Sequence, residues 1–195
     1  MPQHDDFFQR VSDHMGDPNR RKYELNWFRK QIRAASTPQD RKRPSVRDMG
    51  HRHKRKLRIG QMYFMTYDAL HKADLPYYDR FPLFLPFNQV SRGFMGINVH
   101  YLPPALRFEL FHELRSLVRG GTFDEDARFQ RLSWQTLTRA ARNRYIEPAV
   151  KRYRGDRVRS PFVEIHGDEW HIAAAIDIAN FRGANKTTVW AESVG

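Results

Sequence analysis

The surplus of positive over negative charge in this chain is concentrated in one segment, and this limits which residues can form a common core. The 195 residues carry a net charge of +12. Residues 20–58 alone hold fifteen Lys and Arg against three acidic residues, a balance of +12, whereas residues 1–19 carry −3 and residues 59–195 carry +3. A segment with so much like charge cannot bury enough apolar surface to fold alone. The sequence therefore predicts a basic N-terminal arm, residues 1–58, and a compact domain, residues 59–195.

The composition of the domain supports this division. The chain has 14 Phe, 8 Tyr and 4 Trp, and most of these rings follow residue 60, where a single domain of roughly 120–140 residues has room for a core. The absence of Cys excludes disulfides and thiolate chemistry. No apolar run approaches the about 18 residues that span a bilayer, and the N-terminus lacks the apolar segment of a signal peptide. We therefore expect a soluble protein, made in a reducing cytoplasm, with no membrane partner.

Hydrophobic spacing predicts an α+β fold. Within the arm, residues 22–35 have the period of a short amphipathic helix, and residues 37–58 are expected to be extended and to order only against a partner. Three short strands are predicted at 62–67, 82–87 and 93–102, the second as an edge or barrel strand because prolines bound it. Two helices follow, one from Pro103-Pro104 to Gly120-Gly121 and one after the acidic run 124–126. We expect a small curved antiparallel sheet or SH3-like barrel with two or three helices.

The arm is the strongest candidate for a binding site. Each of its bases is able to neutralise a phosphate, and binding of this kind depends steeply on salt. The candidate nucleic-acid-binding residues are Arg41, Lys42, Arg43, Arg47, Arg52, Lys54, Arg55, Lys56 and Arg58. No helix-turn-helix, zinc finger or RNA-recognition motif is present, so we expect sequence-independent contact with double-stranded DNA. The alternative is an arm that binds an acidic protein surface or keeps the chain soluble.

A second basic stretch runs from Arg139 to Arg159. Tyr145 and Tyr153 lie among its bases as candidate stacking platforms for nucleotide bases. The favoured interpretation is an exposed helix face whose arginine stems cover apolar surface.

The loop after the first strand holds residue types that bind divalent cations. These are Asp68, His71 and Asp74, with Asp79 downstream, and they would suit a nuclease. Their spacing matches no known signature, and Asp in loops usually caps turns. His100 is interpreted as a structural histidine, and no GxSxG, P-loop or GxGxxG occurs. We therefore predict no enzyme activity, no metal, no cofactor and no small-molecule substrate.

The segment from Tyr77 to Pro82 places three aromatic residues around Asp79 and Arg80. We interpret it as a structural corner in which the rings are buried, Asp79 caps the turn and Arg80 points outward. The alternative is a protein-binding surface, since aromatic residues and Arg are enriched at interfaces.

Three blocks of the domain carry a resemblance to a known family. They are GQMYFMTYD at 60–68, LPYYDRFPL at 75–83 and GFMGINVHYLP at 93–103, supported by WFRKQ at 27–31, Trp170, Phe181 and VWAES at 189–193. With these blocks the chain resembles the DNA end protector, or head completion, proteins of T-even-type contractile-tailed phages.

The resemblance implies a protein of the virion, assembled in the host cytoplasm and added late in head assembly. It would cover the ends of packaged DNA, shield them from exonucleases and help the head and tail to join, with no catalytic residues. The expected partners are then DNA and other virion proteins at the portal, neck, tail or baseplate. The alternative is a structural component of the neck, tail or baseplate whose arm locks onto neighbouring subunits.

Overall fold

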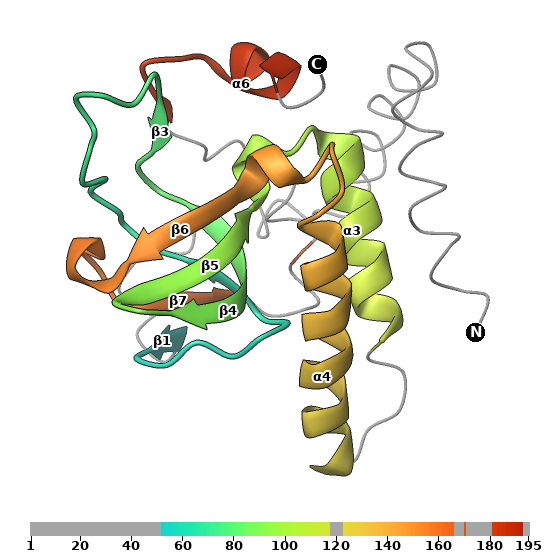
Figure 1. The fold of residues 1–195 in the computed structure, drawn as a ribbon. Helices are drawn as coiled ribbons and strands as arrows, with labels where there is room; N and C mark the ends of the chain where they lie inside the picture. Colours follow the sequence, from blue (N-terminus) through green and yellow to red (C-terminus); the bar gives the residue numbers. More distant parts are fainter. Residues whose placement is uncertain (1–51, 118–122, 166–169, 171–180, 193–195) are drawn as a thin grey trace, which may run out of the picture.

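The computed structural model describes residues 52–117, 123–165, 170 and 181–192, and within them it shows an α+β domain (Figure 1). The helices are α3 (Pro104–Ser116), α4 (Phe123–Ala140) and α6 (Lys186–Glu192), with 3₁₀ turns η2 (Val99–Tyr101), η3 (Glu147–Ala149) and η4 (Gly155–Arg157). The strands are β1 (His53–Lys54), β2 (Met62–Phe64), β3 (Tyr78–Asp79), β4 (Leu83–Val90), β5 (Gly93–Asn98), β6 (Val150–Arg154), β7 (Phe162–Ile165) and β8 (Phe181–Arg182). The predicted fold class is confirmed.

Six of the strands form one antiparallel sheet in the order β1-β7-β2-β4-β5-β6, and β3 pairs with β8 in a separate ribbon. The antiparallel pairing of β2 with β7 continues past the end of β2, into the segment between η4 and β7. Tyr67 forms an isolated bridge with Val158, and the Arg159 amide donates to the Thr66 carbonyl at 2.9 Å. These contacts lengthen the β2–β7 pair of the small antiparallel sheet, and η4 carries the chain from β6 at one edge across to β7.

Alternating side chains give the sheet two buried faces. Met62, Leu83 and Leu85 belong to a core shared with the helices, whereas Tyr63 and Phe84, their neighbours in sequence, belong to a second core. Successive strand residues point to opposite faces, so strands with this near-continuous apolar sequence are buried on both sides. The second core is largely aromatic, and it extends toward the part of the sheet that carries the candidate site.

The three predicted strands are present as β2, β4 and β5, but β2 and β5 are shorter than predicted, and Val99–Tyr101 form η2 in place of strand. β4 lies between β2 and β5, so it is a central strand and not an edge strand. Pro86 is tolerated within it because the β4–β5 register shifts between Pro86 and Asn88, which is a bulge. Gly93 permits the close approach of β6, because a Cβ at this position would lie 1.9 Å from the Tyr153 carbonyl oxygen.

Helices α3 and α4 stand on one side of the sheet (Figure 1), as the apolar spacing predicted. Leu106, Leu110 and Leu114 of α3 and Leu137 of α4 are fully buried in the core that the helices share with the sheet. Trp170, from the apolar segment near the C-terminus, packs against Phe111 with 5.8 Å between ring centroids. No helix in the described ranges is long and apolar enough to span a membrane.

The prediction of an exposed helix between Arg139 and Arg159 is wrong. After α4 this stretch contains η3, strand β6 and η4. On the edge strand β6 the bases lie on both faces, because Lys151 shares a face with Tyr153 and Arg152 shares one with Arg154. A stretch so rich in bases is easily mistaken for a solvated helix face when only charge is counted.

Most of the predicted arm lies outside the described residues, and so do the helix predicted at 22–35, residues 37–51, Gly120-Gly121 and residues 171–178. The last part of the arm does belong to the sheet, since His53 pairs with Val163 and Lys54 with Phe162. The division into an arm and a domain at residue 58 stays a prediction.

Candidate nucleic-acid interface

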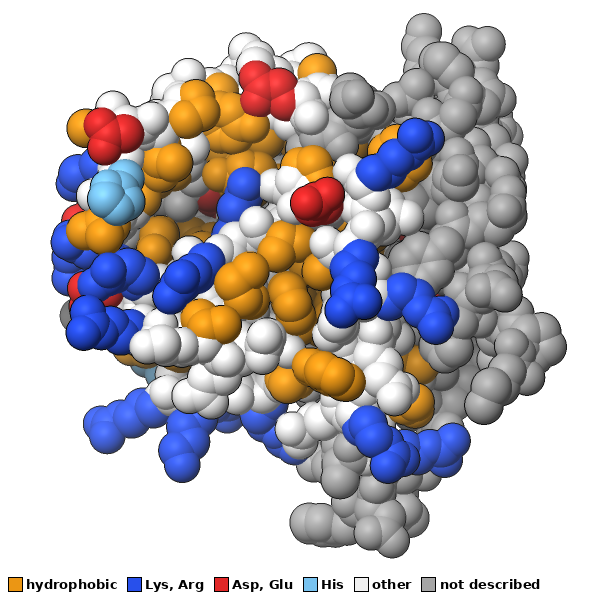
Figure 2. Space-filling model, viewed as in Figure 1, with side chains coloured by type: hydrophobic (Ala, Val, Ile, Leu, Met, Phe, Trp, Pro, Cys, Tyr) orange, Lys and Arg blue, Asp and Glu red, His pale blue; other side chains and the backbone are white. Residues whose placement is uncertain are grey.

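The predicted phosphate contacts fall into two groups. Arg41, Lys42, Arg43 and Arg47 lie outside the described residues. Arg52, Lys54, Arg55, Lys56 and Arg58 lie on and around β1, which is the last strand at one edge of the sheet. All of the second group except Arg52 are exposed, and Figure 2 shows Lys and Arg side chains gathered along one border of the visible face.

Backbone pairing holds this second group in place. β1 pairs with β7, and the Arg58 amide donates a hydrogen bond to the Tyr63 hydroxyl at 3.0 Å. The Lys54 amine lies 3.3 Å from a Glu164 carboxylate oxygen across the pair. Lys54 on the paired strand, together with the exposed Arg55, Lys56 and Arg58 that follow it, forms a positively charged border that is able to bind a phosphate backbone without reading bases.

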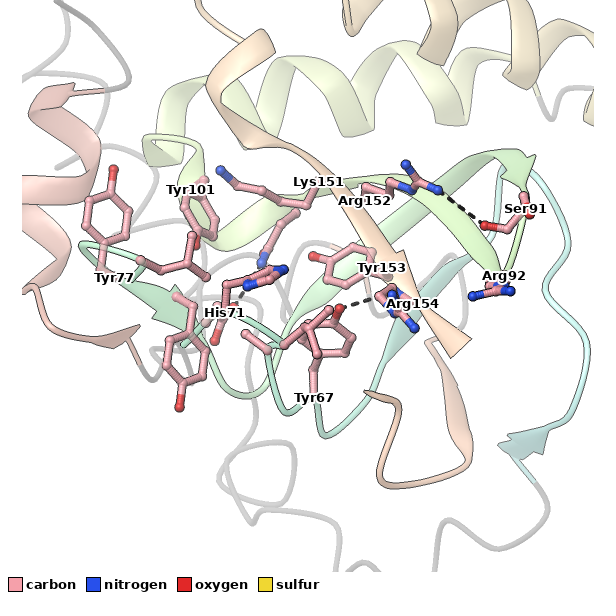
Figure 3. A pocket seen from close by; sticks show the side chains of 16 residues that line it. Tyr67, His71, Tyr77, Ser91, Arg92, Tyr101, Lys151, Arg152, Tyr153 and Arg154 are labelled. Atoms are coloured by element: carbon pink, nitrogen blue, oxygen red, sulfur yellow. Dashed lines mark hydrogen bonds between the residues drawn. The ribbon is translucent and has the colours of Figure 1, made fainter. Parts of the chain in front are cut away.

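A cleft of about 700 Å³ opens at the other edge of the sheet, beside β6 (Figure 3). Its sixteen lining residues come from Tyr67 and the loop after it, from β3, from the β4–β5 turn, from the end of β5 and η2, and from β6. Five of them are tyrosines and five are basic: Tyr67, Tyr77, Tyr78, Tyr101 and Tyr153, then His71, Arg92, Lys151, Arg152 and Arg154. Aromatic rings next to cations are the combination that nucleotides bind.

The floor of the cleft is rigid. Tyr153 packs against Tyr67 edge to face at 5.1 Å and against Phe84 and Phe94 at 5.4 and 5.2 Å between ring centroids. Its hydroxyl lies near Asn98 but makes no hydrogen bond of normal geometry within the described part of the chain. Tyr153, a candidate stacking platform in the sequence, has its ring buried in the aromatic core and only lines the floor.

Lys151 is the unusual cation of the cleft. Its side chain is half-buried, and its amine lies 4.0 Å from the centre of the Tyr101 ring (Figure 3). Burial lowers the pKa of Lys151 from 10.5 to about 8. No carboxylate of the described residues forms an ion pair with this amine. The cleft therefore holds a positive charge that the protein only partly compensates.

The other bases of the cleft are oriented by local contacts. The Arg154 guanidinium binds both carboxylate oxygens of Asp156 at 2.9 Å, and the Arg152 guanidinium donates to the Ser91 carbonyl at 3.3 Å. Arg92 is exposed at the tight β4–β5 turn with φ of 61°, a left-handed conformation that non-glycine residues rarely adopt. This strained turn holds a third guanidinium at the cleft.

A buried polar network lies behind the floor. The His100 Nδ1 lies 2.6 Å from an Asp79 carboxylate oxygen, and the Asn98 amide donates to the same oxygen at 3.1 Å. Burial by itself would raise the pKa of Asp79, but the hydrogen bonds that its carboxylate accepts outweigh burial and lower that pKa. Burial also lowers the pKa of His100, so a neutral ring donates its Nδ1–H to an ionised Asp79.

This network accounts for the structural corner predicted at Tyr77–Pro82. Asp79 accepts a hydrogen bond from the Phe81 amide at 3.0 Å, so it caps the turn as expected, and Arg80 is exposed with its guanidinium over the Phe81 ring. Tyr77 is half-buried, and burial together with the hydrogen bond to Glu192 raises its pKa to about 12.

The four candidate metal ligands are not brought together. Asp68 pairs with Lys72 at 2.8 Å, the exposed His71 lies 3.8 Å from Asp74, and Asp79 is committed to the buried network. No group of three or more metal-capable side chains occurs among the described residues. Tyr78, Lys151 and Arg92, by contrast, line the cleft and were missed. The spacing of Lys151 and Tyr153, two residues apart and so on one face of a strand, was the available signal, but it requires a strand where we expected a helix.

The fold and this surface define a class: an α+β protein with a basic sheet border and an aromatic, cationic cleft, suited to a polyanion. Within that class the chain belongs to the family of the phage T4 terminal DNA protecting protein, whose family model matches residues 6–193. The predicted resemblance is confirmed, and a family of DNA protecting proteins is not a family of enzymes. No curated protein and no solved structure matches the chain.

Proposed function

We propose that this chain is a virion protein that binds the ends and backbone of packaged double-stranded DNA, protects the DNA and completes the phage head. The observation that carries the proposal is the family match over residues 6–193. The exposed bases around β1 fit this role, because they supply charge for a phosphate backbone and no geometry for reading bases. Assembly would take place in the host cytoplasm before the particle is released.

The proposal predicts a particular salt dependence. The logarithm of the affinity for duplex DNA falls linearly with the logarithm of salt concentration, by about 0.9 for each phosphate neutralised. A variant with six bases changed to Ala should therefore bind weakly, with a slope shallower by up to about 5. The six are Arg41, Lys42, Arg43, Lys54, Arg55 and Lys56.

The control changes three exposed bases outside the arm and the cleft to Ala: Lys72, Arg80 and Arg142. It should leave the slope almost unchanged. DNA affinity that is absent at low salt, or that does not depend on salt, would refute the proposal. Loss of the thermal unfolding transition in the six-residue variant would instead refute the division into an arm and a separately folded domain.

A second candidate is a structural component of the neck, tail or baseplate whose arm locks onto acidic subunits. The Lys54–Glu164 ion pair shows that a base of this segment is able to pair with a carboxylate, and β1 is an edge strand available to a neighbouring chain. Locating the chain in intact particles separates the two candidates. A position at the portal with density reaching the DNA supports end protection, and a position in the baseplate supports the structural role.

A further inference from the structure

The cleft beside β6 has a role that the basic border around β1 cannot fill. A row of exposed cations binds phosphates anywhere along a duplex, so it gives no preference for an end. Protection of DNA ends requires a feature of the protein that distinguishes an end from the interior. The face of a base and the terminal phosphate are both accessible only at an end, because the interior bases are stacked on each other.

We propose that this cleft binds the terminal nucleotide of a DNA strand, with the base against the tyrosines of its rim and the phosphate at Lys151. This inference rests on the proposed function and names the part of the DNA that the chain recognises. The cleft volume of about 700 Å³ lies within the range of about 300–1,000 Å³ typical of small-molecule sites. It is therefore large enough for a nucleotide and too small for a duplex.

The rim supplies the aromatic surface. Tyr77 and Tyr78 are half-buried at the edge of the cleft, and Leu75 beside them is 43% exposed. Tyr101 and Tyr153 are at most 4% exposed, so they shape the floor and are not available for stacking over a full ring face. The Tyr77 hydroxyl is held by Glu192 of α6 at 2.5 Å, which orients one ring of the rim before any ligand arrives.

The phosphate position follows from the charge. Lys151 is half-buried without an ion-pairing carboxylate among the described residues, so an anion that enters the cleft would supply the missing counter-charge. Arg92 and Arg152 also line the cleft, near the β4–β5 turn (Figure 3), where they are able to contact the next phosphate of the strand. The strained φ of 61° at Arg92 is consistent with a position kept for its charge, since Gly or Asn would adopt this turn at lower cost.

Two DNA substrates with the same base-paired sequence test the inference. One is a short duplex with two open ends, and the other is the same duplex with both ends closed by hairpin loops. Binding of the full chain is measured by competition at fixed salt. The wild type should prefer the open duplex at least about 10-fold, because stacking and the terminal phosphate contribute only there.

Two variants, Tyr78→Ala and Lys151→Met, should each reduce this preference toward unity while affinity for the closed duplex stays within about 2-fold. Lys72→Met is the control, because Lys72 is an exposed lysine that does not line the cleft. It should keep the preference of the wild type. Circular dichroism of each variant verifies that it is folded, and competition with deoxyadenosine 5′-monophosphate, deoxyadenosine and inorganic phosphate provides a readout on the wild type alone.

The outcomes separate the two claims. If the wild type binds neither duplex, the proposed function fails and the inference fails with it. If it binds both duplexes equally, or keeps its end preference in both cleft variants, the cleft does not bind the terminal nucleotide although DNA binding stands. Loss of preference in both variants, with the mononucleotide competing better than the nucleoside or phosphate, supports the inference.

Discussion

Replacing Lys151 with Met should make the protein more stable at neutral pH. Burial lowers the pKa of Lys151 from 10.5 to about 8, which corresponds to an upper limit of roughly 3 kcal/mol of cost for the charged form, at about 1.4 kcal/mol per unit. Partial exposure reduces this cost, and the contact of the amine with the Tyr101 ring offsets it by about 0.5–2 kcal/mol. Met keeps the apolar stem and omits the charge, so we expect a net gain of about 1 kcal/mol.

The pH dependence gives the prediction its sign. Below pH 8 both the folded and the unfolded chain hold the Lys151 proton, so the cost is fully present in the wild type. Between about pH 8 and 10.5 the unfolded chain binds the proton more strongly than the folded chain, so wild-type stability rises with pH relative to the variant. The advantage of Met should therefore be largest near pH 7 and should shrink above pH 8.

Urea unfolding of wild type and Lys151→Met at pH 7 and pH 9.5 measures both effects. Comparing the two proteins at each pH cancels the titration of every other group. A variant that is less stable than the wild type at pH 7 would show that Lys151 is held by a stabilising interaction, and the argument for an uncompensated charge would be wrong. Greater stability together with weaker end binding would show that the lysine is kept for binding at a cost to the fold.

Three further substitutions test the framework of the site. Gly93→Ala should cost at least about 3 kcal/mol or prevent folding, because its Cβ would lie 1.9 Å from a backbone oxygen of β6. Gly155→Ala is the control: the nearest atom to an added Cβ there is 3.8 Å away, so stability should change by less than about 1 kcal/mol. Thermal unfolding compares the two variants. Asp79→Ala should cost about 1–3 kcal/mol by leaving the buried Nδ1–H of His100 without an acceptor. Since the pKa of Asp79 is lowered in the folded state, the contribution of its carboxylate to folding stability should be lost as pH falls below 3.8. Unfolding midpoints that change with pH in the same way in wild type and variant would contradict this. Arg92→Asn should leave stability unchanged or raise it by up to about 1 kcal/mol, because Asn tolerates the left-handed turn. The same change should lower affinity for open-ended DNA. An unfolding curve shifted to lower urea would argue against strain at this residue.

The helices and turns that were predicted correctly are those set by residues close together in the sequence. Pro103-Pro104 marks the start of α3 because proline is favoured in the first turn, and the apolar spacing after residue 124 is that of α4. The corner at Asp79 was also predicted, since an Asp that caps a turn acts on a neighbour two residues away. Strand β6 was not, because its Lys and Arg side chains have the composition of a solvated surface, and only pairing with β5 makes that stretch a strand.

The sequence by itself determined where the charge lies, which segments are apolar and to which family the chain belongs, because each of these depends on residue type and order along the chain. Tertiary structure alone decided that Lys151, Arg92 and Tyr78 line one cleft, since they come from β6, the β4–β5 turn and the separate β3–β8 ribbon, which only the complete fold brings together. It also decided that Tyr153 lies in the aromatic core and that Asp79 pairs with His100 across 21 residues. Burial and long-range pairing set the chemistry of these groups, and neither can be read from residues that are neighbours in sequence.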